Sequence, residues 1–131
     1  MAERQTIVPK EMQYLVERAR YAPGVRVGGL LFVSGQVGRD DQGQVVAETE
    51  AQMVQAFENC RKVLTAAGLG FEHVVDITSY HVGLQSHMPT FRAIKNRYLA
   101  DALPCWTAIG VHELAMAGMV IEIKLIAAYP G

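Results

Sequence analysis

The chain has 131 residues, of which 50% are hydrophobic and 19% charged, and its 12 Lys and Arg nearly balance 13 Asp and Glu, for a net charge of −1. This length predicts a single domain over residues 1–131, and the composition is typical of a globular protein with a buried core. The balanced charge argues against a nucleic-acid partner, and no apolar run reaches the roughly 18 residues of a membrane span, so we expect no membrane partner either.

The N-terminal part carries a short ambiguous segment followed by a hairpin pattern. In residues 1–17, the stretch "PKEMQYLVER" places Pro9 where it favours a helix start, which is compatible with one short helix. Two β-like runs then follow, around residues 21–27 and 30–37. The Gly28-Gly29 pair between them predicts a tight turn, and therefore a β-hairpin.

The clearest helical pattern covers residues 47–67, after a predicted turn or loop at residues 39–44. Acidic residues lie near its beginning and basic residues near its end, and Gly68 follows at a position typical of a helix C-terminus. Its apolar residues recur at spacings of four and three and so share one face: Met53, Phe57, Cys60, Leu64 and Ala67. On this face Cys60 is interpreted as a core residue rather than a nucleophile.

A strand and a second helix are expected next. Residues 73–82 are rich in β-branched side chains and alternate in character, which favours a strand. A helix is predicted over residues 87–100, with Ser86 as its N-cap and Pro89 in its first turn. Its inward stripe combines apolar side chains with one charged side chain: Phe91, Ile94, Lys95 and Tyr98. We interpret Lys95 as a residue whose aliphatic stem covers apolar surface while its ammonium group reaches water.

Two strands are predicted at the C-terminal end, over residues 106–114 and 119–129. In the second strand an apolar face alternates with a mixed one, formed by Ile121, Ile123, Leu125 and Ala127 and by Val120, Glu122, Lys124 and Ile126 respectively. Two helices can cover only one face of a sheet of about five strands, and the mixed face is too apolar to be left in water. We therefore expect a partner subunit on that face.

Few residues qualify as catalytic candidates by type and spacing alone. The sequence contains no GxSxG motif, no HExxH motif and no phosphate-binding glycine loop, so no organic cofactor is expected. His81 and His112 lie on predicted strands without the spacing of metal ligands and are interpreted as structural, so no metal is expected. Glu122 is flanked by Ile121 and Ile123, and burial by a partner would suit it to general acid or base chemistry. An ion pair with Arg or Lys across the sheet is the alternative.

The two cysteines and the N-terminus indicate the compartment. Cys60 and Cys105 lie far apart without a CxxC pattern, which is typical of free thiols in a reducing environment. The N-terminal stretch "MAERQTIVPKEMQ" has no apolar core of a secretory signal. We therefore expect a cytoplasmic protein.

Five stretches of the chain, in order between about residue 18 and residue 129, resemble the Rid (YjgF-type) family: "YAPGVRVGGLLFVSGQVG", "AAGLGFEHVVDIT", "FRAIKNRYL", "LPCWTAIGV" and "VIEIKLIAAY". The resemblance implies an α+β fold like that of the Bacillus-type chorismate mutase, and a homotrimer with a barrel-like core and helices outside. It also implies small-molecule ligand clefts between subunits and hydrolysis of reactive enamines and imines. Some relatives are labelled endoribonucleases, but the balanced charge and the lack of a catalytic His pair argue against that activity here.

Carried over position by position, the resemblance implies a site only part of which matches the family. Glu122 corresponds to the carboxylate that positions water or relays a proton, and four residues correspond to the cleft lining: Tyr21, Ser34, Gly35 and Gln36. In deaminating members a Pro-Ala-Arg-Ser motif holds the substrate carboxylate through its Arg; here its positions are occupied by Pro104, Cys105, Trp106 and Thr107. An Asn of the second helix is replaced by Lys95, and Thr107 and Ala108 are expected to help orient the ligand.

Three interpretations of the change from Arg to Trp106 remain open. Lys95 compensates with a point charge for an imino acid, although with less directional control than a bidentate Arg. Alternatively, Trp106 stacks on a flat uncharged or cationic ligand, so that the substrate class is altered. In the third interpretation Trp106 fills the cleft, and the protein is a non-catalytic trimer that binds or senses a small metabolite. We expect an imine or enamine hydrolase that releases ammonia, with the binding protein as the alternative and an isomerase or mutase as a weaker third by fold analogy.

Overall fold

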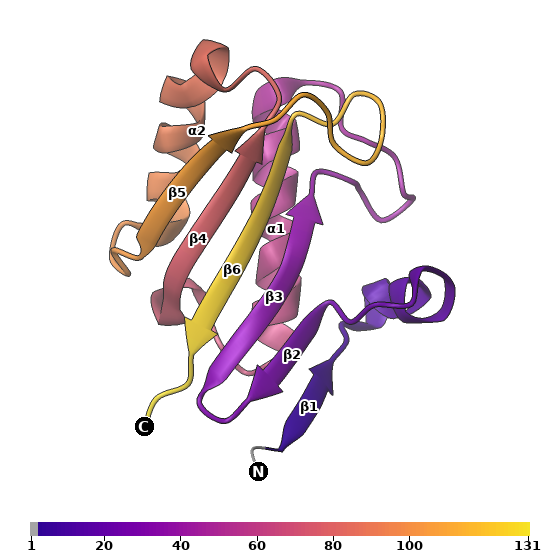
Figure 1. Ribbon diagram of the computed structural model, residues 1–131, viewed down its shortest axis with the longest axis vertical. Coiled ribbons are helices and arrows are strands. Elements are labelled where there is room, and N and C mark those ends of the chain that lie inside the picture. The colour runs from indigo at the N-terminus through magenta and orange to yellow at the C-terminus, as the bar shows by residue number, and fades with distance from the viewer. Residues whose placement is uncertain (1–2) are drawn as a thin grey trace.

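A six-stranded sheet with two long helices on one of its faces forms the fold (Figure 1). The structure is a computed structural model that describes residues 3–131, so Met1 and Ala2 of the expected N-terminal segment lie outside the described residues. The strands are β1 Arg4–Ile7, β2 Gly24–Val27, β3 Leu30–Val37, β4 Val74–His81, β5 Cys105–Gly110 and β6 Ile121–Ala128, and the helices are α1 Thr49–Ala66 and α2 Leu84–Leu99. The expected α+β architecture with two helices on one face of the sheet is thereby confirmed.

The C-terminal strand β6 occupies the middle of the sheet, between β3 and β4, in the order β1-β2-β3-β6-β4-β5. All neighbouring strands are antiparallel except β4 and β5, which run parallel. A parallel pair needs a crossover connection, and α2 supplies it by returning the chain over the helical face. This crossover places α2 beside the edge strand β5, and so brings Lys95 near Trp106.

The N-terminal segment differs from the expected single short helix. Residues Arg4–Ile7 form β1, which pairs with β2, and the chain then makes two short helical turns, Lys10–Met12 and Leu15–Ala19. Only Ile7 of the four β1 residues is buried, so the apolar alternation that would predict a strand is missing from this stretch. Pairing with β2, rather than a local pattern, explains this strand.

Helix α2 begins at Leu84 and not at the expected residue 87. Its N-cap is Gly83, which has φ of +79°, and Ser86 lies inside the first turn, where its hydroxyl donates to the Gly83 carbonyl at 2.7 Å. A positive φ favours glycine, so Gly83 marks this boundary better than the serine. Strand β5 likewise ends at Gly110, before the expected end at residue 114.

The apolar stripe of α1 is the centre of the core, as predicted. Met53, Phe57, Cys60 and Leu64 are 0% exposed, and Ala67 is half-buried just beyond the helix. The ring of Phe57 stacks on neighbouring rings, with centroid distances of 5.8 Å to Phe91 and 4.7 Å to Tyr98. Each fully buried large side chain contributes about 1.5–3 kcal/mol, so this stripe supplies much of the force that holds α1 on the sheet. Burial also raises the pKa of the Cys60 thiol, in agreement with a core role.

No element of residues 3–131 covers the other face of the sheet, in front of the strands in Figure 1. Phe32 and Ile126 pair across β3 and β6 on this face, and Phe32 and Ile109 are 39% and 38% exposed. A partner subunit on this face stays a prediction. Within the described chain, neither α1 nor α2 nor any shorter helix has the length and hydrophobicity needed to cross a membrane.

Candidate functional site

Glu122 and Trp106, two residues expected at the site, lie on opposite faces of the sheet. In β6, Ile121 and Ile123 are 0% exposed against the helices, so Glu122 between them points to the uncovered face. Ser79 is paired with Ile123 and therefore faces the helices, and its hydroxyl lies 3.0 Å from the indole nitrogen of Trp106. We name the Glu122 group as Tyr21, Ser34, Gly35, Gln36 and Glu122, and the Trp106 group as Ser79, His81, His87, Lys95 and Trp106.

The Glu122 carboxyl group lies directly against the backbone of Gly35. The register between β3 and β6 shifts between Val33 and Gln36, which places Gly35 in the irregular part of β3. A Cβ atom on residue 35 would overlap Oε2 of Glu122 and lie 2.7 Å from its Cδ. A residue without a side chain is therefore required at position 35 for Glu122 to take this position.

Tyr21 lies near Glu122 and keeps its proton at neutral pH. Partial burial raises the pKa of its phenol, with smaller contributions from Tyr14 and from the Glu122 carboxylate, while the Arg39 guanidinium opposes them. The ring is 42% exposed, so its hydroxyl can meet a ligand. Tyr21 therefore presents a neutral O–H donor within the field of a carboxylate and a guanidinium.

Ser34 and Gln36 hold the backbone on which Tyr21 is placed. The Ser34 hydroxyl donates to the Ala22 carbonyl at 2.6 Å, and the Ser34 N–H donates to the Pro23 carbonyl at 2.9 Å. The buried Gln36 amide donates to the Ser34 carbonyl at 3.1 Å. Ser34 thus fixes the segment that follows Tyr21 to β3, whereas the Gln36 bond lies within β3.

A cavity of about 390 Å³ adjoins the Glu122 group. Tyr21, Gly35 and Gln36 line one wall, and the rest comes from the N-terminal turns, the turn after β3 and helix α1, including Arg18 and Arg39. Glu122 contacts the lining residue Gly35 but is not itself in the lining. Sequence reasoning missed the two arginines, because only the folded N-terminal turns and the turn after β3 bring them beside Tyr21.

The ion-pair alternative for Glu122 finds no support within residues 3–131. Three ion pairs of Lys or Arg with a carboxylate occur there, and they join Arg61 to Glu58, Lys62 to Asp41 and Arg97 to Glu50. Glu122 is in none of them, although Lys124 lies two residues away on the same face of β6. The carboxylate is therefore available as a base or as a hydrogen-bond acceptor.

A chain of buried hydrogen bonds joins the members of the Trp106 group. Trp106 Nε1 donates to Ser79 Oγ at 3.0 Å, Ser79 Oγ lies 2.7 Å from His81 Nε2, and His81 Nδ1 lies 3.0 Å from His87 Nε2. Ser79 and His81 are 0% exposed and His87 is 8% exposed. Four polar side chains thus satisfy one another inside the apolar layer between sheet and helices.

The direction of these bonds follows from what each group can donate. Ser79 accepts from Trp106, and His81 Nε2 is the acceptor within reach of its hydroxyl proton. His81 then carries its proton on Nδ1 and donates it to Nε2 of His87, so both rings are neutral. The pKa values agree, because burial and the neighbouring His87 lower the pKa of His81 to about 4, and burial lowers the pKa of His87.

Ser79, His81 and His87 have the spacing of a nucleophile, a base and a group that orients the base. However, Ser79 is 0% exposed, and its oxygen already receives the indole N–H of Trp106. A nucleophile must reach its substrate, so we assign this array a structural role. It holds the indole plane of Trp106.

The ammonium group of Lys95 lies over the indole ring of Trp106. Its Nζ is 4.6 Å from the ring centroid and donates to Oδ1 of Asn96 at 2.9 Å. Burial, and then the charge of Arg92, lower the pKa of this ammonium group. Ala108 shares the half-buried face of Trp106, whereas Thr107 points to the opposite face and is exposed. The structure thus brings Lys95, Trp106 and Ala108 together and places Thr107 on the other side of β5.

Comparisons with known proteins agree with this fold. Residues 12–129 match the family model described as Endoribonuclease L-PSP. The RutC family protein YjgH of Escherichia coli (strain K12) is 38% identical over 131 residues, which cover 99% of this chain and 98% of that protein. A solved structure of YjgH superposes with a TM-score of 0.88 at 37% identity and covers 98% of both chains. The structure of RidA from an Antarctic Psychrobacter bacterium has a TM-score of 0.77 at 29% identity, covering 82% of this chain and 87% of its own.

Proposed function

The chain belongs to the YjgF/Rid family, whose model is described as Endoribonuclease L-PSP, and from this premise we propose that it hydrolyses a reactive imine or enamine metabolite to a carbonyl compound and ammonia. The observation that carries the proposal is the position of Glu122. Its half-buried carboxylate lies against Gly35 and takes part in none of the ion pairs of residues 3–131. Its charge also contributes to the raised pKa of the Tyr21 phenol. A carboxylate base beside a neutral donor suits the addition of water to a C=N bond.

In the proposed reaction Glu122 takes a proton from water while the water oxygen attacks the imine carbon. The electron pair of the C=N bond moves to nitrogen, Glu122 passes the water proton on to that nitrogen, and a neutral carbinolamine results. Glu122 then takes the proton of the carbinolamine hydroxyl group and delivers it to nitrogen, the C–N bond breaks, and the oxygen forms the carbonyl group as ammonia leaves. Tyr21 donates a hydrogen bond to the ligand throughout, because its raised pKa keeps it protonated at neutral pH.

We propose that the ligand cleft lies between subunits of a homotrimer. Glu122 and Trp106 lie on opposite faces of one sheet, so a single chain cannot bring both to one ligand. A second copy on the uncovered face would bury Phe32 and Ile109. In this assembly Thr107, which is exposed on that face, would lie close to the boundary.

The contacts of Trp106 argue against this side chain as a direct replacement for a binding arginine. Its N–H, the only donor of the side chain, is bonded to Ser79, and the Lys95 ammonium group lies over its ring. A ligand next to Trp106 and Lys95 therefore meets the edge of an aromatic ring and a single ammonium charge. It does not meet the two parallel N–H donors of a guanidinium group. The same observation favours a second candidate, a protein that binds a small metabolite without turnover.

We do not carry the endoribonuclease name of the family model over to this chain. The cavity beside Tyr21 is lined by three basic residues, Arg18, Arg39 and Lys62, and by three acidic ones, Glu11, Asp40 and Asp41. Such a balanced lining lacks the positive field that a polyphosphate backbone requires. We propose a cytoplasmic setting, which fits the two free thiols of Cys60 and Cys105.

The test measures hydrolysis of freshly generated 2-iminobutanoate and 2-iminopropanoate by the wild type, Glu122→Ala and Trp106→Arg. Acceleration by the wild type that is lost in Glu122→Ala supports the hydrolase. An inactive wild type combined with an active Trp106→Arg shows a competent scaffold whose natural substrate is of another class. Ligand binding that survives Glu122→Ala and fails in Trp106→Ala supports the binding protein instead.

A further inference from the structure

Arg39 is a cation of the cavity beside Tyr21 whose guanidinium group is bonded to the turn after β3. It lies two residues after the end of β3 and is half-buried, and its Nε donates to the carbonyl of Gly43 at 3.2 Å across the turn. That bond uses Nε and leaves the two terminal nitrogens of the guanidinium group for other partners. No ion pair among residues 3–131 includes Arg39.

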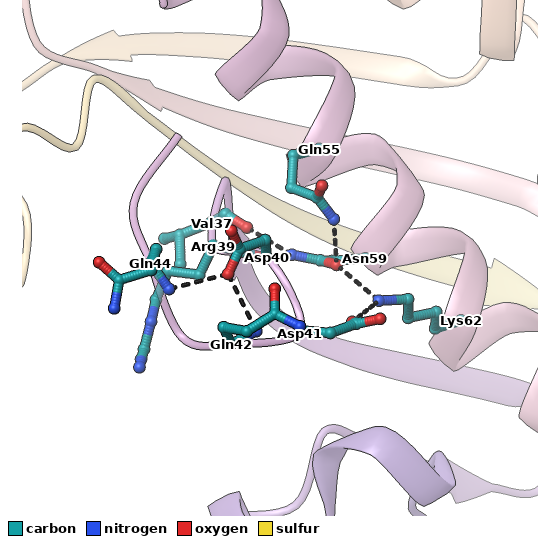
Figure 2. A network of polar contacts seen from close by, with 9 residues as sticks. All are labelled: Val37, Arg39, Asp40, Asp41, Gln42, Gln44, Gln55, Asn59 and Lys62. Carbon is teal, nitrogen blue, oxygen red and sulfur yellow. Dashed lines mark hydrogen bonds and ion pairs between the residues drawn. The ribbon is translucent and has the colours of Figure 1, made fainter. Parts of the chain in front are cut away.

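Helix α1 fixes the backbone that carries this guanidinium. Asn59 donates from its amide to the carbonyls of Arg39 and Val37, at 2.9 Å and 2.8 Å (Figure 2). Gln55 donates to Asn59 Oδ1 at 3.0 Å, and Lys62 donates to the same oxygen at 3.3 Å. Because Asn59 is buried and all its polar atoms are bonded, the end of β3 is anchored to the core. A ligand that binds Arg39 therefore loses little affinity to the ordering of this backbone segment.

Two of the three acidic residues that line the cavity, Asp40 and Asp41, are already engaged by other groups of the protein. Asp41 pairs with Lys62 at 2.7 Å, and Oδ1 of Asp40 accepts the N–H groups of Gln42 and Gln44, both at 2.9 Å (Figure 2). Neither carboxylate is paired with the guanidinium of Arg39, but both lie in the cavity lining and repel anions. A doubly charged phosphate feels this repulsion more than a singly charged carboxylate does.

We propose that Arg39 binds the carboxylate group of the ligand, in the cavity formed with Tyr21, Gly35 and Gln36. The inference rests on the proposed function, since it assigns the residue of that same site that would hold a carboxylate of the imine or enamine. Two terminal guanidinium nitrogens match the two oxygens of a carboxylate, and this pairing fixes the plane of the bound group. The reactive carbon of such a ligand then extends past Gly35 toward Glu122, and the Trp106 side needs no arginine.

Calorimetric titration with 2-oxobutanoate tests the inference without depending on turnover, because the product analogue carries the same carboxylate. Arg39→Gln is expected to weaken binding at least tenfold. Arg39→Lys also loses the Nε bond to Gly43 but keeps the charge, so it should retain more affinity than Arg39→Gln. The matched control is Arg26→Gln, since Arg26 likewise donates from Nε to a glycine carbonyl, that of Gly28, outside this cavity. Inorganic phosphate serves as the competing anion and should bind more weakly than the carboxylate.

The inference is overturned if wild type binds no 2-oxobutanoate, if Arg39→Gln binds it as tightly as wild type, or if Arg26→Gln loses as much affinity. It is also overturned if phosphate binds more tightly than the carboxylate. Imine hydrolysis measured in parallel separates the two proposals. Turnover with an unchanged KM in Arg39→Gln upholds the hydrolase and removes Arg39 from its site. Arg39-dependent binding without turnover upholds the carboxylate site and removes the hydrolase.

Discussion

The indole nitrogen of Trp106 lies 3.0 Å from the hydroxyl oxygen of Ser79, so the side chain that departs from the family motif is bonded into the protein interior. Ser79 in turn reaches His81, and His81 reaches His87. Trp106 is the only tryptophan of the chain, and its fluorescence therefore reports on this arrangement directly.

Replacing Ser79 by Ala should lower the free energy of unfolding by about 1–3 kcal/mol. The change leaves the buried N–H of Trp106 and Nε2 of His81 without their partner, and unsatisfied buried groups cost about that much. Urea unfolding followed by Trp106 fluorescence measures the loss, and the native emission should shift as well. Ser86→Ala is the control, since its exposed hydroxyl bonds only Gly83. Equal losses in the two variants would contradict the buried chain.

The stability of the protein should fall between about pH 6.5 and pH 4 through His81. The pKa of His81 is lowered from 6.5 to about 4 in the folded state, chiefly by burial. Within this window the unfolded chain binds a proton that the folded chain does not, so the free energy of unfolding decreases as pH falls. The expected loss is about 2–3 kcal/mol, because one unit of pKa corresponds to about 1.36 kcal/mol.

Urea titrations at successive pH values measure this effect, and NMR titration of the His81 ring gives its pKa directly. His112→Gln, on the exposed side of the chain, should leave the pH dependence unchanged. A His81 ring that titrates at or above pH 6.5 would show that it is not buried as a neutral acceptor.

Gly35→Ala should reduce imine hydrolysis at least tenfold and destabilise the fold by about 1–3 kcal/mol. The added methyl group would overlap the Glu122 carboxyl group, so either Glu122 or the backbone of β3 has to move. Steady-state kinetics and urea unfolding measure the two effects. Gly29→Ala provides the comparison, since no atom lies within 4 Å of a Cβ there and no positive φ restricts it. Wild-type kinetics in Gly35→Ala would remove the close Gly35–Glu122 contact from the mechanism.

Lys95→Met should cost about 0.5–1 kcal/mol of stability and change the emission of Trp106. The ammonium group lies 4.6 Å from the indole centroid, and a partly exposed cation–π contact is worth about that amount. Met keeps most of the apolar stem, so the difference reports the charge. Lys10→Met, at an exposed position in the N-terminal turns, should change neither quantity. An unchanged emission spectrum in Lys95→Met would place the ammonium group away from the indole in solution.

The element types were predictable because their signals are local. The spacing of Met53, Phe57, Cys60 and Leu64 predicted α1 and its buried face, and the Gly28-Gly29 pair predicted the hairpin of β2 and β3. Strand β1 was not predicted, because three of its four residues are exposed and its stability comes from pairing with β2. The spacing of apolar residues predicts an element that buries its own side chains. It does not predict an element, such as β1, that is stabilised by pairing with another strand.

The sequence could indicate which candidate side chains share a face of a strand, but not which of them the fold brings together. Alternation within β4 and β6 could place Ser79 beside His81 and Glu122 opposite Ile121, since side chains two apart share a face. The register of the parallel pair β4 and β5 and the crossover by α2 decide that Trp106, His87 and Lys95 join Ser79. The folded turn after β3 likewise brings Arg39 to the cavity that Tyr21 lines.

By itself, the sequence thus determined the family resemblance, the strands and helices of the core, and the identity of Glu122 as the carboxylate of interest. Only the tertiary structure decided that Glu122 and Trp106 lie on opposite faces, that the indole N–H is bonded to Ser79, and that Arg39 lies beside Tyr21. The physical reason is that the pattern of a strand or helix is set by neighbours along the chain. Hydrogen bonds between distant side chains depend on strand register and on helix packing, which form only when the whole core closes.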